Sequence, residues 1–226
     1  MRVLVEAIRA HEPIPKRTAE RRAVELLRRV GIPQPERRVE DYPHQFSGGM
    51  RQRVMIAMAL ALNPKLLIAD EPTTALDVTV QAQIIELMKA LQVEYGMAII
   101  LITHDLSVVA GIAHDVLVMY AGQAMEHGDR GSIYRRPHHP YTEGLLHALP
   151  SRTVAKSRLI PIPGLPPSLI HPPAGCPFHP RCRYVMERCR SETPPQRVVG
   201  AGGHVSACWL PPDRAGLQAQ AARAAP

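Results

Sequence analysis

The chain has 226 residues, a length that suits one ordinary domain with an appendage or two small domains. Hydrophobic residues make up 46% of it and charged residues 21%, which excludes a wholly disordered chain, and the longest purely apolar run (54–62) is far shorter than the roughly 20 residues of a membrane-spanning helix. The whole net charge of +7 falls in residues 151–226, where ten basic and three acidic residues are too dilute for a dense nucleic-acid-binding patch.

Hydrophobic periodicity and turn residues predict a series of helices and short apolar strands. In chain order we first expect a helix over 18–30 that Thr18 can cap, a break at Pro43, and a helix of about 12 residues after 46–50. A buried strand over 66–69, a helix over 78–95 between Asp77 and Gly96, and a second buried strand over 98–103 follow. After a short helix to about 113 we expect a strand over 115–120, a turn at 121–122, and a short edge strand over 123–127 that pairs back.

Apolar strands that are separated by helices indicate an α/β fold with a mostly parallel sheet covered on both faces. Such sheets place their chemistry at the carboxyl ends of the strands. Asp70 and Glu71 follow the first buried strand, and His104 follows the second. We therefore expect these three side chains at one edge of the sheet.

The composition changes near residue 150. Of the 23 prolines, 16 lie at or beyond Pro137, and residues 1–150 carry 17 basic and 17 acidic residues, so only the part after 150 is basic. This basic tail could meet nucleic acid, anionic lipid or an acidic protein face, but its dilute charge favours a plain solvated surface.

Ser47, Gly48 and Gly49 stand directly before a predicted helix. A helix N-terminus with a hydroxyl beside it can bind an anion such as phosphate. The plainer alternative is an ordinary serine cap before an amphipathic helix.

The three residues at the strand ends suit phosphate chemistry. Asp70 could hold Mg²⁺, Glu71 could orient or deprotonate an attacking water, and His104 could hydrogen-bond a terminal phosphate. The structural alternatives are that Asp70 and Glu71 are exposed acids at a strand-to-loop junction and that His104 is a structural imidazole.

Taken together and in this order, these motifs resemble the nucleotide-binding subunits of ABC transporters. FSGGM (46–50) is similar to the family signature, with Phe46 and Met50 where the commonest form has Leu and Gln; LLIADE (66–71) is similar to the Walker B strand, ALD (75–77) to the D-loop, and His104 to the switch histidine. The longer stretches around them, and HPYTEGLLHALP (139–150), resemble the dipeptide and oligopeptide importer branch, which carries a Cys-bearing C-terminal extension.

The resemblance implies the carboxyl-terminal part of a P-loop ABC nucleotide-binding domain. It divides the chain into a partial helical subdomain (1–64), a partial ATPase core (65–150) and an irregular C-terminal extension (151–226). It also implies an energy-coupling subunit of a peptide importer, bound peripherally at the cytoplasmic face of the inner membrane, with integral permease subunits and a second, identical or different, ATPase subunit as partners.

The resemblance also gives roles to single residues. ATP and Mg²⁺ would be bound by Asp70 in the Walker B strand, Glu71 and His104 would be catalytic, Asp77 would lie at the dimer interface, and the signature would reach a partner's nucleotide in trans through Ser47, Gly48 and Gly49.

One family motif is missing. No Gly in this chain is followed by Lys, so the Walker A pattern G-x-x-x-x-G-K-S/T is absent. We expect the chain to be the carboxyl-terminal part of such a subunit, truncated at the N-terminus. Since the Walker A loop supplies most of the nucleotide affinity, we expect neither tight ATP binding nor ATPase activity from this chain alone.

All four cysteines lie in the tail, at Cys176, Cys182, Cys189 and Cys208. Because Glu6 and Arg9 interrupt the region where an export signal would be apolar, we expect a reducing compartment and hence thiols. The wide spacing favours a [4Fe–4S] cluster, with zinc or no metal as alternatives, and some members of the peptide-importer branch carry such a cluster.

Two other functions compete with the importer hypothesis. The first is an ABC-type ATPase of DNA repair or chromosome organisation, which would need long coiled-coil arms that the sequence does not show. The second is a non-enzymatic iron–sulfur or zinc module whose ATPase half is vestigial.

Overall fold

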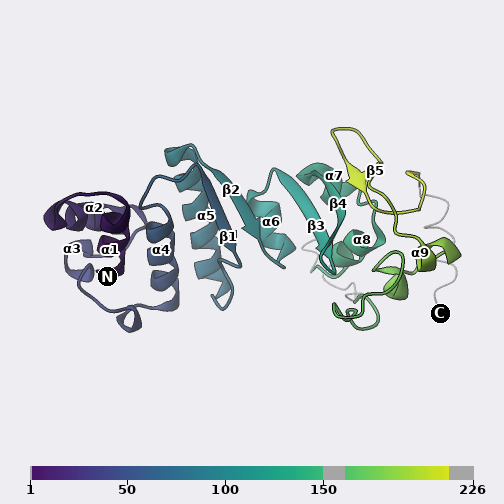
Figure 1. Cartoon of the computed structure of the whole chain (residues 1–226), viewed down its shortest axis with the longest axis horizontal. Coiled ribbons are helices and arrows are strands. Elements are labelled where there is room, and N and C mark those ends of the chain that lie inside the picture. Colours follow the sequence, from purple (N-terminus) through teal and green to yellow (C-terminus); the bar gives the residue numbers. More distant parts are fainter. Residues whose placement is uncertain (1, 150–160, 214–226) are drawn as a thin grey trace. The chain divides into compact units, whose positions relative to one another are not determined.

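The computed structural model describes residues 2–149 and 161–213, which fall into two compact units, Met1–Ile112 and Ala113–Pro226 (Figure 1). Among the described residues, no helix combines the length and the apolar character that crossing a membrane requires.

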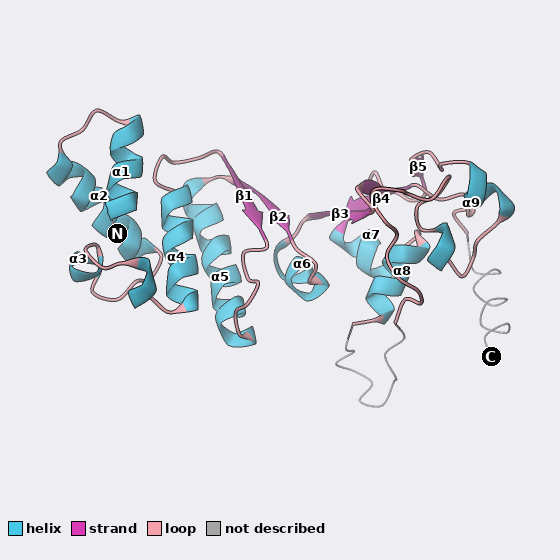
Figure 2. Cartoon of the chain, turned by 60° about the horizontal axis from the view of Figure 1, so that its bottom comes forward, coloured by secondary structure: helices cyan, strands magenta, loops and turns pink. Residues whose placement is uncertain are grey.

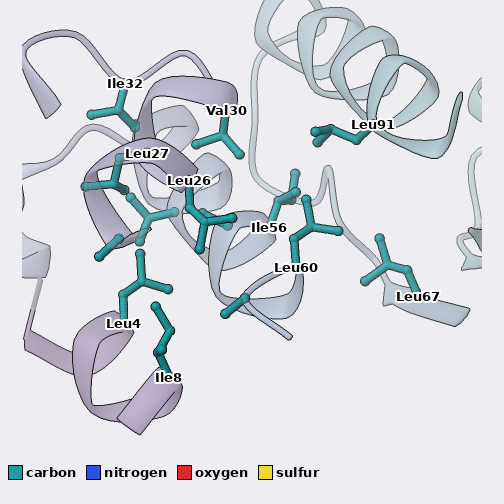
Figure 3. Packing of buried hydrophobic residues seen from close by; sticks show 14 of the residues in the cluster. Leu4, Ile8, Leu26, Leu27, Val30, Ile32, Ile56, Leu60, Leu67 and Leu91 are labelled. Atoms are coloured by element: carbon teal, nitrogen blue, oxygen red, sulfur yellow. The ribbon is translucent and has the colours of Figure 1, made fainter. Parts of the chain in front are cut away.

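The first unit begins with a group of helices around one apolar core. They are α1 (Arg2–His11), α2 (Lys16–Arg29), α3 (Pro35–Arg38), the short 3-10 helix η1 (Pro43–Gln45) and α4 (Gly48–Ala59). Leu4 and Ile8 of α1 lie against Leu27 of α2, and Leu60 closes the core at the end of α4 (Figure 3). All four side chains are fully buried, so their burial holds these helices together.

The helix predicted over 18–30 starts two residues earlier, at Lys16. Its N-cap is Pro15, which makes no side-chain capping bond, so the expectation that Thr18 caps this helix is wrong. Proline at this place fixes the backbone before the first turn without needing a cap hydroxyl.

The helix α5 (Val78–Tyr95) has the predicted ends. The Asp77 carboxylate accepts a hydrogen bond from the Val80 N–H at 2.9 Å, and Gly96 ends the helix at a φ of 61°, where a side chain would be strained. Figure 2 shows α5 beside α4, in agreement with their close packing.

The strands β1 (Leu66–Asp70) and β2 (Ala98–Ile102) pair in parallel, with Leu66 opposite Ala98 and Asp70 opposite Ile102. A short helix, α6 (Leu106–Ile112), follows β2. Because both strands run the same way, Asp70 and the segment after Ile102 lie at the same end of the sheet, as the sequence predicts.

The two faces of this sheet differ in burial. Leu67, Ala69, Ile99 and Leu101 pack against the apolar core. The opposite face is uncovered: the side chains of Leu66, Ile68, Ile100 and Ile102 are 47–62% exposed. The prediction of two buried strands is therefore wrong for that face, because the core of this unit lies on one side of the sheet only.

The second unit contains an antiparallel sheet and short helices. Its elements are β3 (Asp115–Tyr120), β4 (Gln123–Asp129), α7 (Arg130–Arg135), α8 (Pro140–His147), η2 (His179–Arg181), α9 (Glu187–Ser191), β5 (Arg197–Val198) and β6 (Val205–Ser206), with the strand order β3-β4-β6-β5.

Two strand predictions need correction here. The predicted turn is confirmed: Ala121 and Gly122, both at positive φ, turn the chain straight back from β3 into β4, which pairs with it antiparallel. The expectation that this third strand joins the parallel sheet is wrong, because among the described residues β3 pairs with β4 alone. The predicted edge strand over 123–127 is a central strand that runs to Asp129, because β6 pairs with it through Glu126 and His127.

The exposed face of the β1–β2 sheet generates a prediction about self-association. Ile68 and Ile100 lie opposite each other on that face, and an uncovered apolar strand surface promotes aggregation. Replacing both with Thr keeps β-branched side chains and removes apolar surface, so the double variant should scatter less light at equal concentration. As the matched control, Leu67→Thr on the buried face should cost about 2 kcal/mol or more of stability in a thermal melt. Equal aggregation of the Ile68→Thr/Ile100→Thr variant and the wild type would show that this face does not cause self-association.

Candidate nucleotide site

The first group of candidate residues meets at the carboxyl ends of β1 and β2. Glu71 continues the strand pairing, since its N–H donates to the Ile102 carbonyl at 2.8 Å. Its Oε1 accepts from the backbone N–H of His104 at 3.2 Å and lies 2.8 Å from the ring Nδ1 of His104. The sequence predicted this meeting of Glu71 and His104.

Thr74 completes the contacts of Glu71, and the sequence reasoning missed it. The Thr74 hydroxyl donates to Glu71 Oε2 at 2.8 Å. The signal that could have found it is its spacing, because a Thr three residues after an acid in a turn can return a hydrogen bond to it. Glu71 itself sits at a φ of 46°, an unfavourable backbone region for a non-glycine residue, which is typical of functional turns.

Glu71 and His104 shift each other's pKa in opposite directions. The His104 ring and then the Thr74 hydroxyl hold the pKa of Glu71 below its ordinary value. In turn the hydrogen bond to Glu71 raises the pKa of His104 above its ordinary value. His104 is largely exposed, so this contact orients the two side chains more than it stabilises the fold.

Asp70 and Asp105 flank this group. Asp70 is exposed at the end of β1, where its carboxylate can take up a cation from solvent. Asp105 has a structural role: one oxygen accepts from Gln81 of α5 at 2.9 Å and the other from the Ser107 N–H at 2.8 Å. These bonds hold the turn after His104 against α5.

The signature residues form a second group of contacts. Ser47 is the N-cap of α4, and its hydroxyl accepts from the Met50 N–H at 3.3 Å. The helix cap is the plainer of the two alternatives for Ser47. A cap hydroxyl at a helix N-terminus can still contribute to an anion site.

The two glycines of the signature have a packing reason. A Cβ atom on Gly49 would lie 2.6 Å from Cγ1 of Val80, and one on Gly48 would lie 3.5 Å from Cδ2 of Leu76. The start of α4 therefore approaches the D-loop and the first turn of α5 so closely that Gly49 cannot be replaced without a shift. Asp77, the N-cap of α5, follows Leu76 directly in the chain.

The four cysteines gather in the second unit. Cys176 and Cys189 lie in its apolar core with Cys182 packed against them, and the Cys176 N–H donates to the Cys189 carbonyl at 2.9 Å. Burial raises the pKa of the Cys182 thiol to about 12, and the neighbouring thiols of Cys208, Cys176 and Cys189 act in the same direction. The sequence did not predict that these cysteines share a core with aromatic residues.

The thiols are not arranged as a ligand set. Within residues 2–149 and 161–213, no group of three or more His, Cys, Asp or Glu side chains is placed to hold a metal ion. The two histidines near the cysteines are engaged elsewhere: His179 contacts the Cys176 carbonyl at 3.0 Å, and His204 contacts Glu126 at 2.7 Å.

Two family models match parts of the chain. Residues 2–74 match the family described as "ABC transporter", and residues 125–189 match "Oligopeptide/dipeptide transporter, C-terminal region". The chain is 54% identical over 213 residues to the dipeptide transport ATP-binding protein DppD of Escherichia coli, which covers 94% of this chain and 65% of that protein. Over most of its length the chain is therefore similar to ATP-binding proteins of dipeptide and oligopeptide ABC transporters.

Other relatives agree with this similarity. Identity is 50% to the oligopeptide transport ATP-binding protein OppD of Haemophilus influenzae (95% of this chain, 66% of that protein) and 54% to OppD of Bacillus subtilis (93% and 59%). The chain thus spans 59–66% of the length of these three relatives.

A solved structure, CbiO1 of Clostridium perfringens, described as part of the ABC transporter complex cbiONQ, is also similar. It is 31% identical with a TM-score of 0.50, over 56% of this chain and 49% of that one. This likeness confirms the predicted α/β fold class, and the match to the transporter branch argues against a DNA-repair ATPase.

Proposed function

We propose that this chain couples ATP binding and hydrolysis to the import of dipeptides or oligopeptides. The observation that carries the proposal is the contact of Glu71 with His104 and Thr74 at the ends of two parallel strands, in a chain that also matches the peptide-transporter C-terminal region. The proposal includes the three-part division at residues 64 and 150 and a peripheral position at the cytoplasmic face of the inner membrane.

The strand-end residues suit the hydrolytic side of an ATP site. Mg²⁺ bound with ATP neutralises phosphate charge, and the exposed carboxylate of Asp70 is an oxygen ligand of the kind this ion takes. Glu71 would orient the attacking water. Its hydrogen bonds to His104 and Thr74 hold the Glu71 side chain in place for this role.

His104 would sense the terminal phosphate. Its Nδ1 atom faces Glu71, so Nε2 is the ring nitrogen left for a phosphate oxygen, to which it donates when the imidazole is protonated. Oε2 of Glu71 accepts one hydrogen bond, from Thr74, so it keeps a lone pair that could orient a water.

The signature would act on a second ATPase subunit. The sequence has no Walker A pattern, so it contains no phosphate-binding loop that would act together with Asp70 and Glu71. Ser47, Gly48 and Gly49 present a capped helix N-terminus that could complete the nucleotide site of a partner in trans. Asp77 would lie at the same interface, and integral permease subunits would transmit the motion.

A substitution at Ser47 tests the role in trans. Asp is as good a helix cap as Ser, but its negative charge would repel a partner's γ-phosphate. We expect Ser47→Asp to keep the melting temperature of the chain and to abolish its stimulation of ATP hydrolysis by a full-length partner such as the Escherichia coli DppD protein. Circular dichroism checks the fold. Stimulation by the variant equal to that of the wild type would reduce Ser47 to a helix cap.

We also propose that the four thiols hold a [4Fe–4S] cluster, with one zinc ion as the alternative. Four thiols are a donor set that either group accepts: Cys176, Cys182 and Cys189 share one core, and Cys208 is near enough to Cys182 to affect its pKa. Among the described residues, these side chains are not placed as a metal site.

The metal proposal predicts a brown protein after anaerobic purification, with roughly four irons per chain. Each of the four Cys→Ser variants should lose most of the iron, because each opens one ligand position. His179→Ala is the matched control near the same core and should keep the iron. One zinc per chain would support the four cysteines as ligands and contradict the iron–sulfur cluster. A metal-free protein would contradict both the cluster and the zinc site.

A further inference from the structure

The turn that carries His104 is fastened to the first turn of α5 by a side-chain hydrogen bond. Nε2 of Gln81 donates to Oδ2 of Asp105 at 2.9 Å, and Asp105 directly follows His104 in the chain. The roles proposed for Asp70, Glu71 and His104 do not account for this bond.

Asp105 lies at the centre of a set of local hydrogen bonds. Its other carboxylate oxygen, Oδ1, accepts from the Ser107 N–H at 2.8 Å, and its own N–H donates to the Thr103 hydroxyl at 3.1 Å. Its carbonyl accepts from two N–H groups of α6. These bonds make the turn one local unit, and the bond from Gln81 joins this unit to a helix residue 24 positions away in the sequence.

The Asp105 carboxylate depends on this donor. Asp105 is partly buried, and burial alone would raise its pKa. The pKa lies below its ordinary value instead, because hydrogen bonds oppose the effect of burial, and the bond from Gln81 is the largest of them. If Gln81 lost its amide, this carboxylate oxygen would have to turn toward water, and the turn that carries His104 would move with it.

The first turn of α5 is itself held in place from two sides. Asp77 caps it through the Val80 N–H at 2.9 Å, and the Gln81 N–H donates to the Asp77 carbonyl at 2.8 Å. Val80 lies against the start of α4, where a Cβ atom on Gly49 would come within 2.6 Å of its Cγ1. Gln81 therefore projects from a turn that the cap and the signature helix keep fixed.

The placement of His104 depends on its own backbone. The His104 N–H and the ring Nδ1 both meet Oε1 of Glu71, at 3.2 and 2.8 Å, so a shift of the backbone there changes both contacts at once. The His104 side chain is 79% exposed, so packing does little to hold the ring. The ring is held by the turn behind it and by Glu71.

We propose that Gln81 is a positioning residue of the hydrolytic site, which holds Asp105 so that His104 stays against Glu71. This inference rests on the proposed function, in which His104 meets the terminal phosphate. Through Val80 and Gln81, the same turn of α5 contacts both the signature helix and the turn of His104.

NMR titration of the His104 ring in the purified chain tests this proposal, with His104→Gln to identify the signal. The contact with Glu71 raises the pKa of His104, so the difference in this pKa between the wild type and Glu71→Gln measures the contact. Gln81→Met keeps the length of the side chain and suits a helix but lacks the donor, so it should lose most of this difference. The matched control is Gln83→Met, an exposed position of the same helix, which should keep the difference in full.

Gln81→Lys supplies a donor to Asp105 again. The charge of Lys alone would lower the pKa of His104, so a pKa above that of Gln81→Met reports restored positioning. Circular dichroism checks that each variant is folded.

The proposal is overturned if Gln81→Met keeps most of the difference, or if the pKa of His104 in Gln81→Lys is no higher than in Gln81→Met. Either result would leave the contact of Glu71 with His104, and with it the proposed function, in place. Equal pKa values of His104 in the wild type and in Glu71→Gln would contradict the positioning role and the proposed function together.

Discussion

The parallel pairing of β1 with β2 is the constraint on which the candidate site depends. It aligns Asp70 with Ile102, so that Glu71 and His104 leave the sheet at the same end and meet at 2.8 Å. A change of register by one residue would carry Glu71 away from the His104 ring and reverse which strand residues face the core. The buried side chains Leu67 and Ala69 fix that register by packing on the helices.

In the second unit, a buried carboxylate holds segments together that are far apart in the sequence. Glu126 is fully buried in β4 and accepts from the backbone N–H groups of His138 and His139 at 2.6 and 3.0 Å, while His204 contacts it at 2.7 Å. Hydrogen bonds to a charged group are worth about 1.5–3 kcal/mol each, which offsets the desolvation of the carboxylate. Glu126 thereby joins the extension that carries the cysteines to the β3–β4 hairpin.

The sequence predicted the local features well, because local residues determine them. Asp77 and Gly96 mark both ends of α5, and the acids after one strand and the histidine after the next mark the site. The long-range features were not predictable in this way. The pairing of β6 with β4 joins residues almost eighty positions apart, and a glutamate in a short strand suggests an exposed side chain, whereas Glu126 is buried. Thr74 escaped notice because its role depends on the turn geometry of Glu71.

The proposed function gives hydrolytic and signature roles to residues of a sequence that contains no Walker A pattern for binding the nucleotide phosphates. Calorimetric titration of the purified chain with Mg-ATP tests it most directly. The account predicts no saturable binding in the micromolar range, since the sequence contains no Walker A lysine to hold the β- and γ-phosphates. A clear micromolar isotherm with one nucleotide per chain would contradict it.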